Sequence, residues 1–153
     1  IRDRNDAQAK LIAAQAAFES ANFTSNVFKL NNNPAGIQYI NKPYQKNATP
    51  GSSFPASESK TAKYAKFATI KDGFKDMIRI TYPALKSNPD PVTYAALLKS
   101  RSYYTGDQGI YTSGLIRYWN QAKDFTKKKI SPFISAILVA SGILIIISAI
   151  KKK

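Results

Sequence analysis

The chain has 153 residues, a formal net charge of +14, and neither cysteine nor histidine. These absences exclude disulfides, thiol nucleophiles, serine–histidine triads and the usual transition-metal sites, so we expect no metal and no cofactor. Any catalysis must use carboxylates, tyrosines, lysines or hydroxyls, and the basic balance favours anionic partners without identifying one.

The first predicted element is a helix from Asp3 to about Ser20, a stretch rich in alanine and free of glycine and proline. Its apolar side chains recur at helical spacing and should form a buried stripe: Ala7, Leu11, Ala14 and Phe18. Glu19 borders this stripe near the end of the helix. We therefore expect the Glu19 carboxyl to be only partly solvated.

Residues 21–60 interrupt the helical pattern with Asn31 to Pro34, Gly36 and further prolines. Gly36 to Ile40 and Lys63 to Thr69 contain enough β-branched and aromatic residues to be short strands. A long polar excursion joins them, and a loop of that length in a small domain is usually functional.

Three further helices are predicted beyond residue 70. The first starts near Ile70 with Asp72 as a plausible N-cap, and Pro83 should end or kink it. The second spans Val92 to Ser100, and the third spans Tyr111 to Phe125. Their predicted buried residues are Phe74, Met77, Ile78, Tyr82, Tyr94, Leu97, Leu98, Leu115, Ile116, Trp119 and Ala122.

The C-terminal region reads as a membrane anchor. Ile130 to Ile150 is a run of 21 uncharged residues, between three lysines at 127–129 and three at 151–153. As a helix it would be about 32 Å long, enough to cross a hydrocarbon core of about 30 Å. We expect one domain over residues 1–126 and an anchor over 127–153. The lysines are equal in number on both sides, so the positive-inside rule gives no orientation.

Several segments, taken in order, resemble one enzyme family. Leu11 to Ser20 reads L-I-A-A-Q-A-A-F-E-S, and residues 31–39 read N-N-N-P-A-G-I-Q-Y. Residues 64–76 read Y-A-K-F-A-T-I-K-D-G-F-K-D. Further along the chain come Y-A-A-L-L from residue 94, Y-T-G-D from residue 104, and Tyr111. This series resembles the glucosaminidase family of peptidoglycan hydrolases (glycoside hydrolase family 73), within the lysozyme-like superfamily. The collinear matches cover residues 11–118.

The resemblance implies a mainly α, α+β fold: a lysozyme-like helical domain with a small β-lobe, here followed by a C-terminal transmembrane helix. It also implies that Glu19 is the catalytic acid. The chemistry agrees, because a carboxyl beside apolar side chains has a raised pKa and keeps a proton to give to the leaving oxygen.

Hydrolysis usually needs a second carboxylate. Glu58 is the only glutamate in the expected β-lobe, where the family often has an acidic residue, and Asp107 and Asp72 are the other candidates. Asp72 is better explained as a helix cap. Tyr104 matches a family tyrosine near the catalytic glutamate, where it would orient the substrate or stabilise positive charge.

The matching segments also supply expected substrate-binding residues: Asn33, Gly36, Tyr39, Asp107 and Tyr111. The sequence departs from the family pattern at residues 21–23, at Pro34-Ala35, at Tyr103, and by one residue inserted before Tyr111. These departures leave the sugar contacts open, and they leave room for an inactive relative.

The expected function is hydrolysis of peptidoglycan glycan strands, of glucosaminidase or muramidase type, by an enzyme held in a membrane by a single C-terminal span. The membrane would be a bacterial envelope or the internal membrane of a lipid-containing phage, where other virion or envelope proteins would be partners. A lytic transglycosylase is the first alternative, and a non-catalytic membrane or virion structural protein is the second. No motif for specific nucleic-acid binding is visible.

Overall fold

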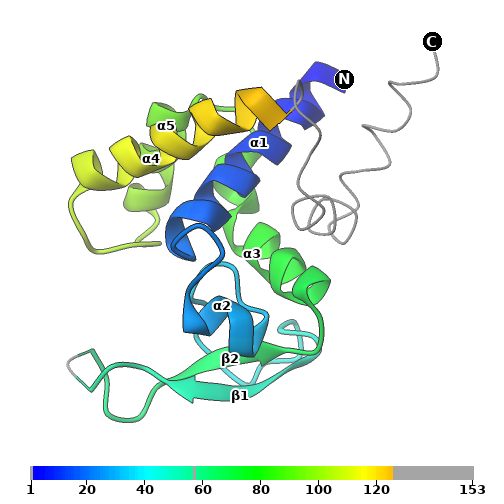
Figure 1. The fold of residues 1–153 in the computed structure, drawn as a ribbon, viewed down its shortest axis with the longest axis vertical. Helices are drawn as coiled ribbons and strands as arrows, with labels where there is room; N and C mark the ends of the chain where they lie inside the picture. Colours follow the sequence, from blue (N-terminus) through cyan, green and yellow to red (C-terminus); the bar gives the residue numbers. More distant parts are fainter. Residues whose placement is uncertain (1, 57, 126–153) are drawn as a thin grey trace.

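The computed structural model of the protein describes residues 2–56 and 58–125 (Figure 1). Five helices and two strands follow one another in these residues: α1 (Arg2–Glu19), α2 (Asn26–Asn31), β1 (Ala48–Ser53), β2 (Lys63–Phe67), α3 (Ile70–Leu85), α4 (Pro91–Ser100) and α5 (Gln108–Phe125). Helices α1, α4 and α5 lie together in Figure 1, the β-hairpin lies at the opposite end with α2, and α3 runs between the two groups. The expected α+β architecture is confirmed.

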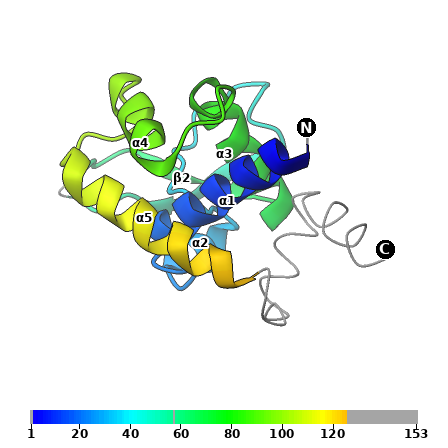
Figure 2. The same cartoon turned by 90° about the horizontal axis from the view of Figure 1, so that it is seen from above.

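The core of the helical group lies where α1 packs against α5 and α5 packs against α4 (Figure 2). Leu11, Leu115 and Leu98 are at most 1% exposed in this core. The helical periodicity predicted these three positions correctly. It was wrong for Tyr82, which is 58% exposed, because no element among the described residues covers that position of α3.

Thr69 is the N-cap of α3, and the predicted cap at Asp72 is wrong by three residues. The Thr69 hydroxyl accepts from the Asp72 backbone N–H and donates to the Asp72 carboxylate, an arrangement like a capping box. Pro83 lies inside α3, which ends at Leu85. Helix α4 begins at Pro91 after its N-cap Asp90.

The sheet differs from the predicted one. β2 lies where a strand was expected, but its partner β1 comes from the stretch expected to be a polar excursion. Gly36 to Ile40 contributes only an isolated bridge between Gln38 and Tyr64. The sequence of β1, A-T-P-G-S-S, has low strand propensity, so pairing with β2 determines its conformation rather than local preference.

Helix α2 was not predicted. Its six residues are too few for an apolar period to be recognised, although Ser25 caps it by accepting from the Phe28 N–H. Phe28 is buried and helps to join α2 to the core.

In the part of the chain that the structure describes, no helix is both long enough and apolar enough to cross a membrane. The predicted span, Ile130 to Ile150, and its flanking lysines lie outside the described residues.

Candidate active site

Glu19 is the last residue of α1. Ser20, only 1% exposed, follows it and closes the helix end: its hydroxyl donates to the Ala16 carbonyl and accepts from the Phe23 N–H. Residues 21–23 then all have φ between 50° and 64°, a left-handed turn made without glycine. Such a turn costs about 1–2 kcal/mol per residue, so the surrounding contacts must hold it in place.

The Glu19 carboxyl is largely withdrawn from water and meets one tyrosine hydroxyl. Burial raises the pKa of Glu19 above its ordinary value of 4.5, and a hydrogen bond from Tyr111 partly opposes that increase. The Tyr111 hydroxyl donates to Glu19 Oε1 over 2.6 Å. Burial and the neighbouring carboxylate also raise the pKa of Tyr111, so this phenol remains a donor. The expected partly solvated carboxyl is therefore present at the end of α1.

The rings of Phe18 and Tyr111 form an aromatic wall beside the Glu19 carboxyl. The Phe18 ring meets the Tyr111 ring edge to face, with centroids 5.1 Å apart. Phe18 also lies directly on Gly114 of α5, where an added Cβ would overlap the ring. Gly114 therefore allows α5 to approach α1 closely enough to shield the Glu19 carboxyl from water.

The Tyr104 hydroxyl bonds to the backbone rather than to Glu19, and the role expected for Tyr104 toward the substrate stays a prediction. Its hydroxyl donates to the Ala95 carbonyl over 3.1 Å, and its ring stacks on Tyr111 with centroids 3.8 Å apart and planes within 4°. Tyr104 therefore supports the ring of Tyr111. The hydroxyl that reaches the carboxylate belongs to Tyr111, which had been expected to bind substrate.

Sequence reasoning did not single out Gln15, whose side chain is 0% exposed. Gln15 Nε2 donates to the Tyr111 hydroxyl over 3.2 Å, and Gln15 Oε1 accepts from the Tyr94 hydroxyl over 2.6 Å. The hydroxyl end of Tyr103 also reaches Gln15, and burial raises the pKa of that phenol. The available signal was spacing, because Gln15 lies four residues before Glu19 and so on the same helix face.

Three of the expected substrate-binding residues, Asn33, Gly36 and Tyr39, belong to the loop after α2. Asn33 is 1% exposed, and its amide donates to the carbonyls of Ile37 and Ala65 while its oxygen accepts from the Ile37 N–H. With its amide enclosed in this way, Asn33 holds the loop against β2 rather than presenting a side chain to a substrate. Gly36 has φ 61°, a left-handed conformation suited to glycine. Tyr39 is partly exposed.

The candidate second carboxylates occupy different places. Asp107 caps α5, since its side chain accepts from the Ile110 N–H over 2.8 Å, and Asp72 belongs to the start of α3. Glu58 is exposed in the connection between β1 and β2, close enough to Tyr64 for its charge to raise the pKa of that tyrosine. Tyr64 stacks on Phe54 with ring centroids 4.0 Å apart.

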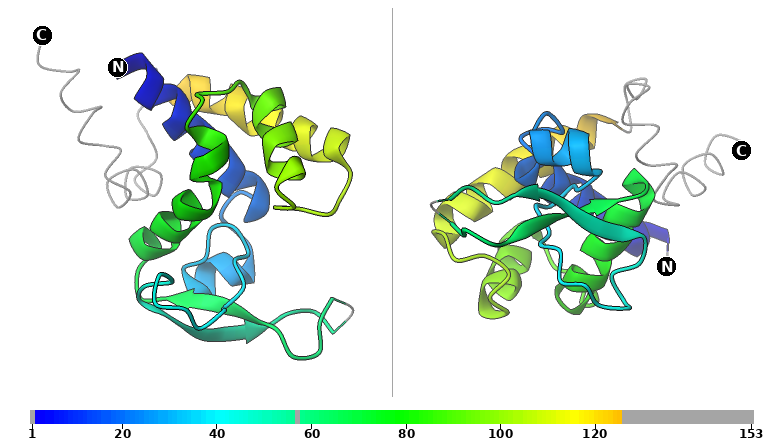
Figure 3. Two further views of the ribbon diagram at one scale, coloured as in Figure 1. Left: turned by 180° about the vertical axis from the view of Figure 1, so that it is seen from behind. Right: turned by 90° about the horizontal axis from the view of Figure 1, so that it is seen from below.

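Glu58 and Glu19 come from different parts of the fold, and the segments that carry them lie on the same side of the molecule. In Figure 3 the β1–β2 connection and the α4–α5 connection both project beyond the C-terminal end of α1. Burial raises the pKa of Glu19 and the Tyr111 hydrogen bond partly opposes it, without a contribution from a second carboxylate among the described residues. Among the carboxyl groups that the structure describes, Glu19 is therefore the one whose surroundings suit a proton donor.

A sequence model of the family described as "Glucosaminidase: Mannosyl-glycoprotein endo-beta-N-acetylglucosaminidase" matches residues 1–124. The chain belongs to the glucosaminidase family. Membership makes it a glycosidase that acts on peptidoglycan, and it confirms the resemblance carried by the motifs. No curated protein and no solved structure matches the chain.

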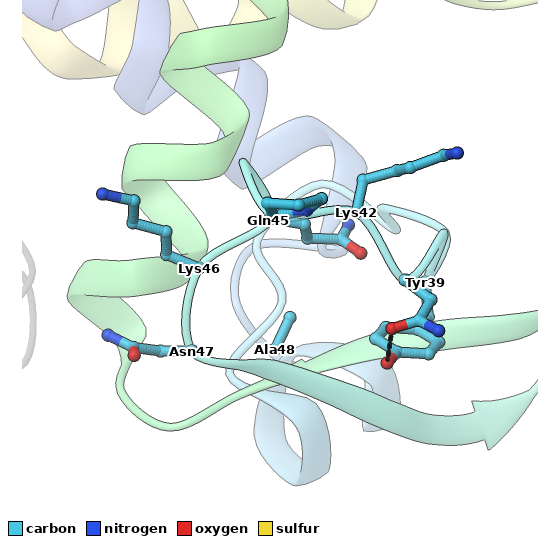
Figure 4. Close-up of a pocket in the computed structure, with 8 residues that line it drawn as sticks. Tyr39, Lys42, Gln45, Lys46, Asn47 and Ala48 are labelled. Atoms are coloured by element: carbon cyan, nitrogen blue, oxygen red, sulfur yellow. Dashed lines mark hydrogen bonds between the residues drawn. The ribbon is translucent and has the colours of Figure 1, made fainter.

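This glucosaminidase also has a pocket of about 370 Å³ beside the loop before β1 (Figure 4). Tyr39 and Lys42 line it, together with residues up to Ala48, and the Tyr39 hydroxyl donates to Asn41 across its rim. Tyr111, which hydrogen-bonds to Glu19, does not line this pocket. Among the expected substrate-binding residues, Tyr39 is the one that lines this pocket, which is separate from the Glu19 carboxyl.

Proposed function

We propose that this glucosaminidase cleaves the glycan strands of peptidoglycan, as a glucosaminidase or muramidase, with Glu19 as the general acid. The observation that carries the proposal is the Glu19 carboxyl itself, buried at the end of α1 beside an aromatic wall and held by the Tyr111 hydroxyl. A carboxyl with a raised pKa retains its proton to a higher pH than a solvated carboxyl does, and cleavage requires that proton to be delivered to the leaving oxygen.

The Tyr111 hydrogen bond would stabilise the Glu19 carboxylate after its proton has been transferred. When Glu19 gives up its proton, negative charge appears on the carboxylate in a poorly solvated place. The Tyr111 hydroxyl, already 2.6 Å from Oε1, donates to that charge without any rearrangement. Glu19 Oε2 is left to carry the proton toward the substrate.

Glu58 is our candidate for the second carboxylate, as the base that activates water or as the nucleophile. The support for this role is the place of Glu58 in the β1–β2 connection, which lies on the side of the molecule toward which the end of α1 points. Its exposure means that a bound glycan would have to complete the site. Catalytic hydrogen bonds and distances often tighten only when substrate binds.

A lytic transglycosylase is the second candidate function, and one observation favours it. Glu19 has no carboxylate partner that affects its pKa among the described residues, and a lytic enzyme cuts the same bond with a single glutamate. No water attacks in that reaction, and the product is an anhydro sugar.

We further propose that residues 127–153 anchor the enzyme in a membrane as a single C-terminal pass, in a bacterial envelope or in the internal membrane of a lipid-containing phage. The support is the sequence alone: 21 uncharged residues from Ile130 to Ile150, bracketed by lysines. The lipid bilayer and other envelope or virion proteins would then be partners.

The proposal is tested with Glu19→Gln, an almost isosteric change that removes the transferable proton. General acid catalysis contributes about 10²- to 10⁴-fold, so clearing of purified peptidoglycan in a zymogram should be lost while the circular dichroism spectrum is unchanged. Undiminished clearing would refute the role of Glu19. Mass spectrometry of the wild-type products separates reducing ends from anhydro ends, and wild-type binding without any cleavage would favour a structural protein.

A further inference from the structure

Four polar side chains form one directional chain of hydrogen bonds that ends on Glu19. The Tyr94 hydroxyl donates to Gln15 Oε1 over 2.6 Å, and Gln15 Nε2 donates to the Tyr111 hydroxyl oxygen over 3.2 Å. The Tyr111 hydroxyl then donates to Glu19 Oε1 over 2.6 Å. Every donor along this chain points toward the carboxyl.

A phenol has a single proton and can direct it to only one acceptor. Because Gln15 presents its N–H to the Tyr111 oxygen, Tyr111 cannot donate back to Gln15, and its proton is left for Glu19. The orientation of the Gln15 amide is fixed in turn, because Gln15 Oε1 is occupied by the Tyr94 proton. A reversed amide would offer an acceptor to Tyr111 and compete with Glu19.

We propose that Gln15 is a positioning residue of this glucosaminidase, which directs the Tyr111 proton to Glu19 and so keeps the general acid in its working orientation. The inference rests on the proposed role of Glu19. Gln15 is completely buried and cannot touch a substrate, so it acts through Tyr111. Tyr94 has the same kind of role one step further from the carboxyl.

A core made only to be stable would not need this arrangement. Burying an amide among phenols requires every polar atom to find a partner, and a hydrocarbon of the same size would avoid that requirement. Gln8 provides the comparison within the same helix: its amide donates to the Leu85 carbonyl over 2.9 Å, away from Glu19. Gln15→Met and Gln8→Met are therefore matched changes in α1, and only the first one interrupts the chain.

The test is a titration of the Glu19 carboxyl in the purified full chain. The sequence has two glutamates, Glu19 and Glu58, so labelling glutamate with ¹³C at the carboxyl gives two signals, and Glu58→Gln assigns them. The Tyr111 hydrogen bond lowers the pKa of Glu19. Without the Gln15 N–H, which holds and polarises the Tyr111 hydroxyl, this hydroxyl becomes a weaker donor to Glu19, and the pKa of Glu19 should rise further. We expect Gln15→Met to raise the pKa of Glu19 and to lower kcat about two- to tenfold, the size of one neutral hydrogen bond, with little change in KM.

Tyr111→Phe should raise the pKa of Glu19 in the same direction, and Gln15→Met should add nothing to it in the double variant, because both changes act through one hydroxyl. Tyr94→Phe, which keeps the ring and removes the proton that fixes the amide, should give a smaller shift of the same sign. This second variant carries the test if Gln15→Met does not fold.

Two results would overturn the proposal. In the first, the pKa of Glu19 in both Gln15→Met and Tyr94→Phe equals that in Gln8→Met. In the second, Gln15→Met shifts the pKa of Glu19 by the same amount when the Tyr111 hydroxyl is absent. Either result would leave the role of Glu19 untouched, since that role depends on whether Glu19→Gln still cleaves peptidoglycan. An active Glu19→Gln enzyme would instead remove the proposed function itself.

Discussion

Glu19 and Tyr111 are separated by 92 residues, and their side chains share a 2.6 Å hydrogen bond where the end of α1 meets the first turn of α5. The contact depends on how closely these two helices approach. It places a hydrogen-bond donor on the carboxyl that we propose as the general acid.

The pH dependence of activity should follow the raised pKa of Glu19. The general acid must be protonated, so kcat should fall as the pH rises through the Glu19 pKa, which burial places above 4.5. This decline should move to higher pH in Tyr111→Phe, because the lost hydrogen bond had lowered that pKa. A profile with the same alkaline limb in both enzymes would contradict the assignment.

The same shift should appear in stability. A carboxyl whose pKa is raised on folding contributes stability that is fully present below its unfolded pKa and is lost as the pH rises through its folded pKa. Relative to Glu19→Gln, the wild-type Tm should therefore decrease as the pH rises from about 4.5 through the raised pKa. Thermal unfolding of both proteins across this range is the measurement. A Tm difference independent of pH would mean that Glu19 is not desolvated.

Gly114→Ala should destabilise the fold and impair catalysis together. The new Cβ overlaps the Phe18 ring, and overpacking of this kind costs about 1–3 kcal/mol. Displacement of Phe18 also moves the adjacent Glu19. Gly106→Ala is the matched control, because a Cβ there meets nothing within 4 Å and should change the stability by less than about 0.5 kcal/mol. Equal effects of the two changes would argue against close packing at Gly114.

Glu58→Gln should lower kcat more than it changes KM, if Glu58 supplies the second carboxylate when a glycan is bound. Steady-state kinetics on purified peptidoglycan fragments give both parameters. Glu58→Gln nearly preserves the size of the side chain and removes its charge, so its consequence can be assigned to the charge. Full turnover in this variant, accompanied by anhydro products, would favour the lytic transglycosylase.

The anchor should resist salt. A membrane-spanning helix is held by its apolar surface, and each flanking lysine adds only about 1 kcal/mol at an anionic surface. The full chain should remain in the membrane fraction at high salt and leave it in detergent, and a chain ending at Phe125 should stay active on isolated cell walls. Release of the full chain by salt would mean that residues 130–150 are not embedded in lipid.

The sequence alone determined the helical framework, because the apolar side chains of α1, α4 and α5 recur at a period that only a helix can bury on one side. It also predicted Glu19 as the acid, through the motif that ends α1. It placed the partner strand of β2 wrongly, because β1 has little local strand preference and is defined by its pairing.

Only the tertiary structure decided which tyrosine meets the acid. Tyr104 and Tyr111 both lie close to the start of α5, and the sequence favoured Tyr104 as the tyrosine near the acid and Tyr111 as a substrate-binding residue. The stacking of their rings turns the Tyr104 hydroxyl to the α4 backbone and leaves the Tyr111 hydroxyl for Glu19. The hydrogen bonds of Gln15 likewise required the tertiary structure, because their direction depends on partners that are distant in sequence and adjacent only after folding.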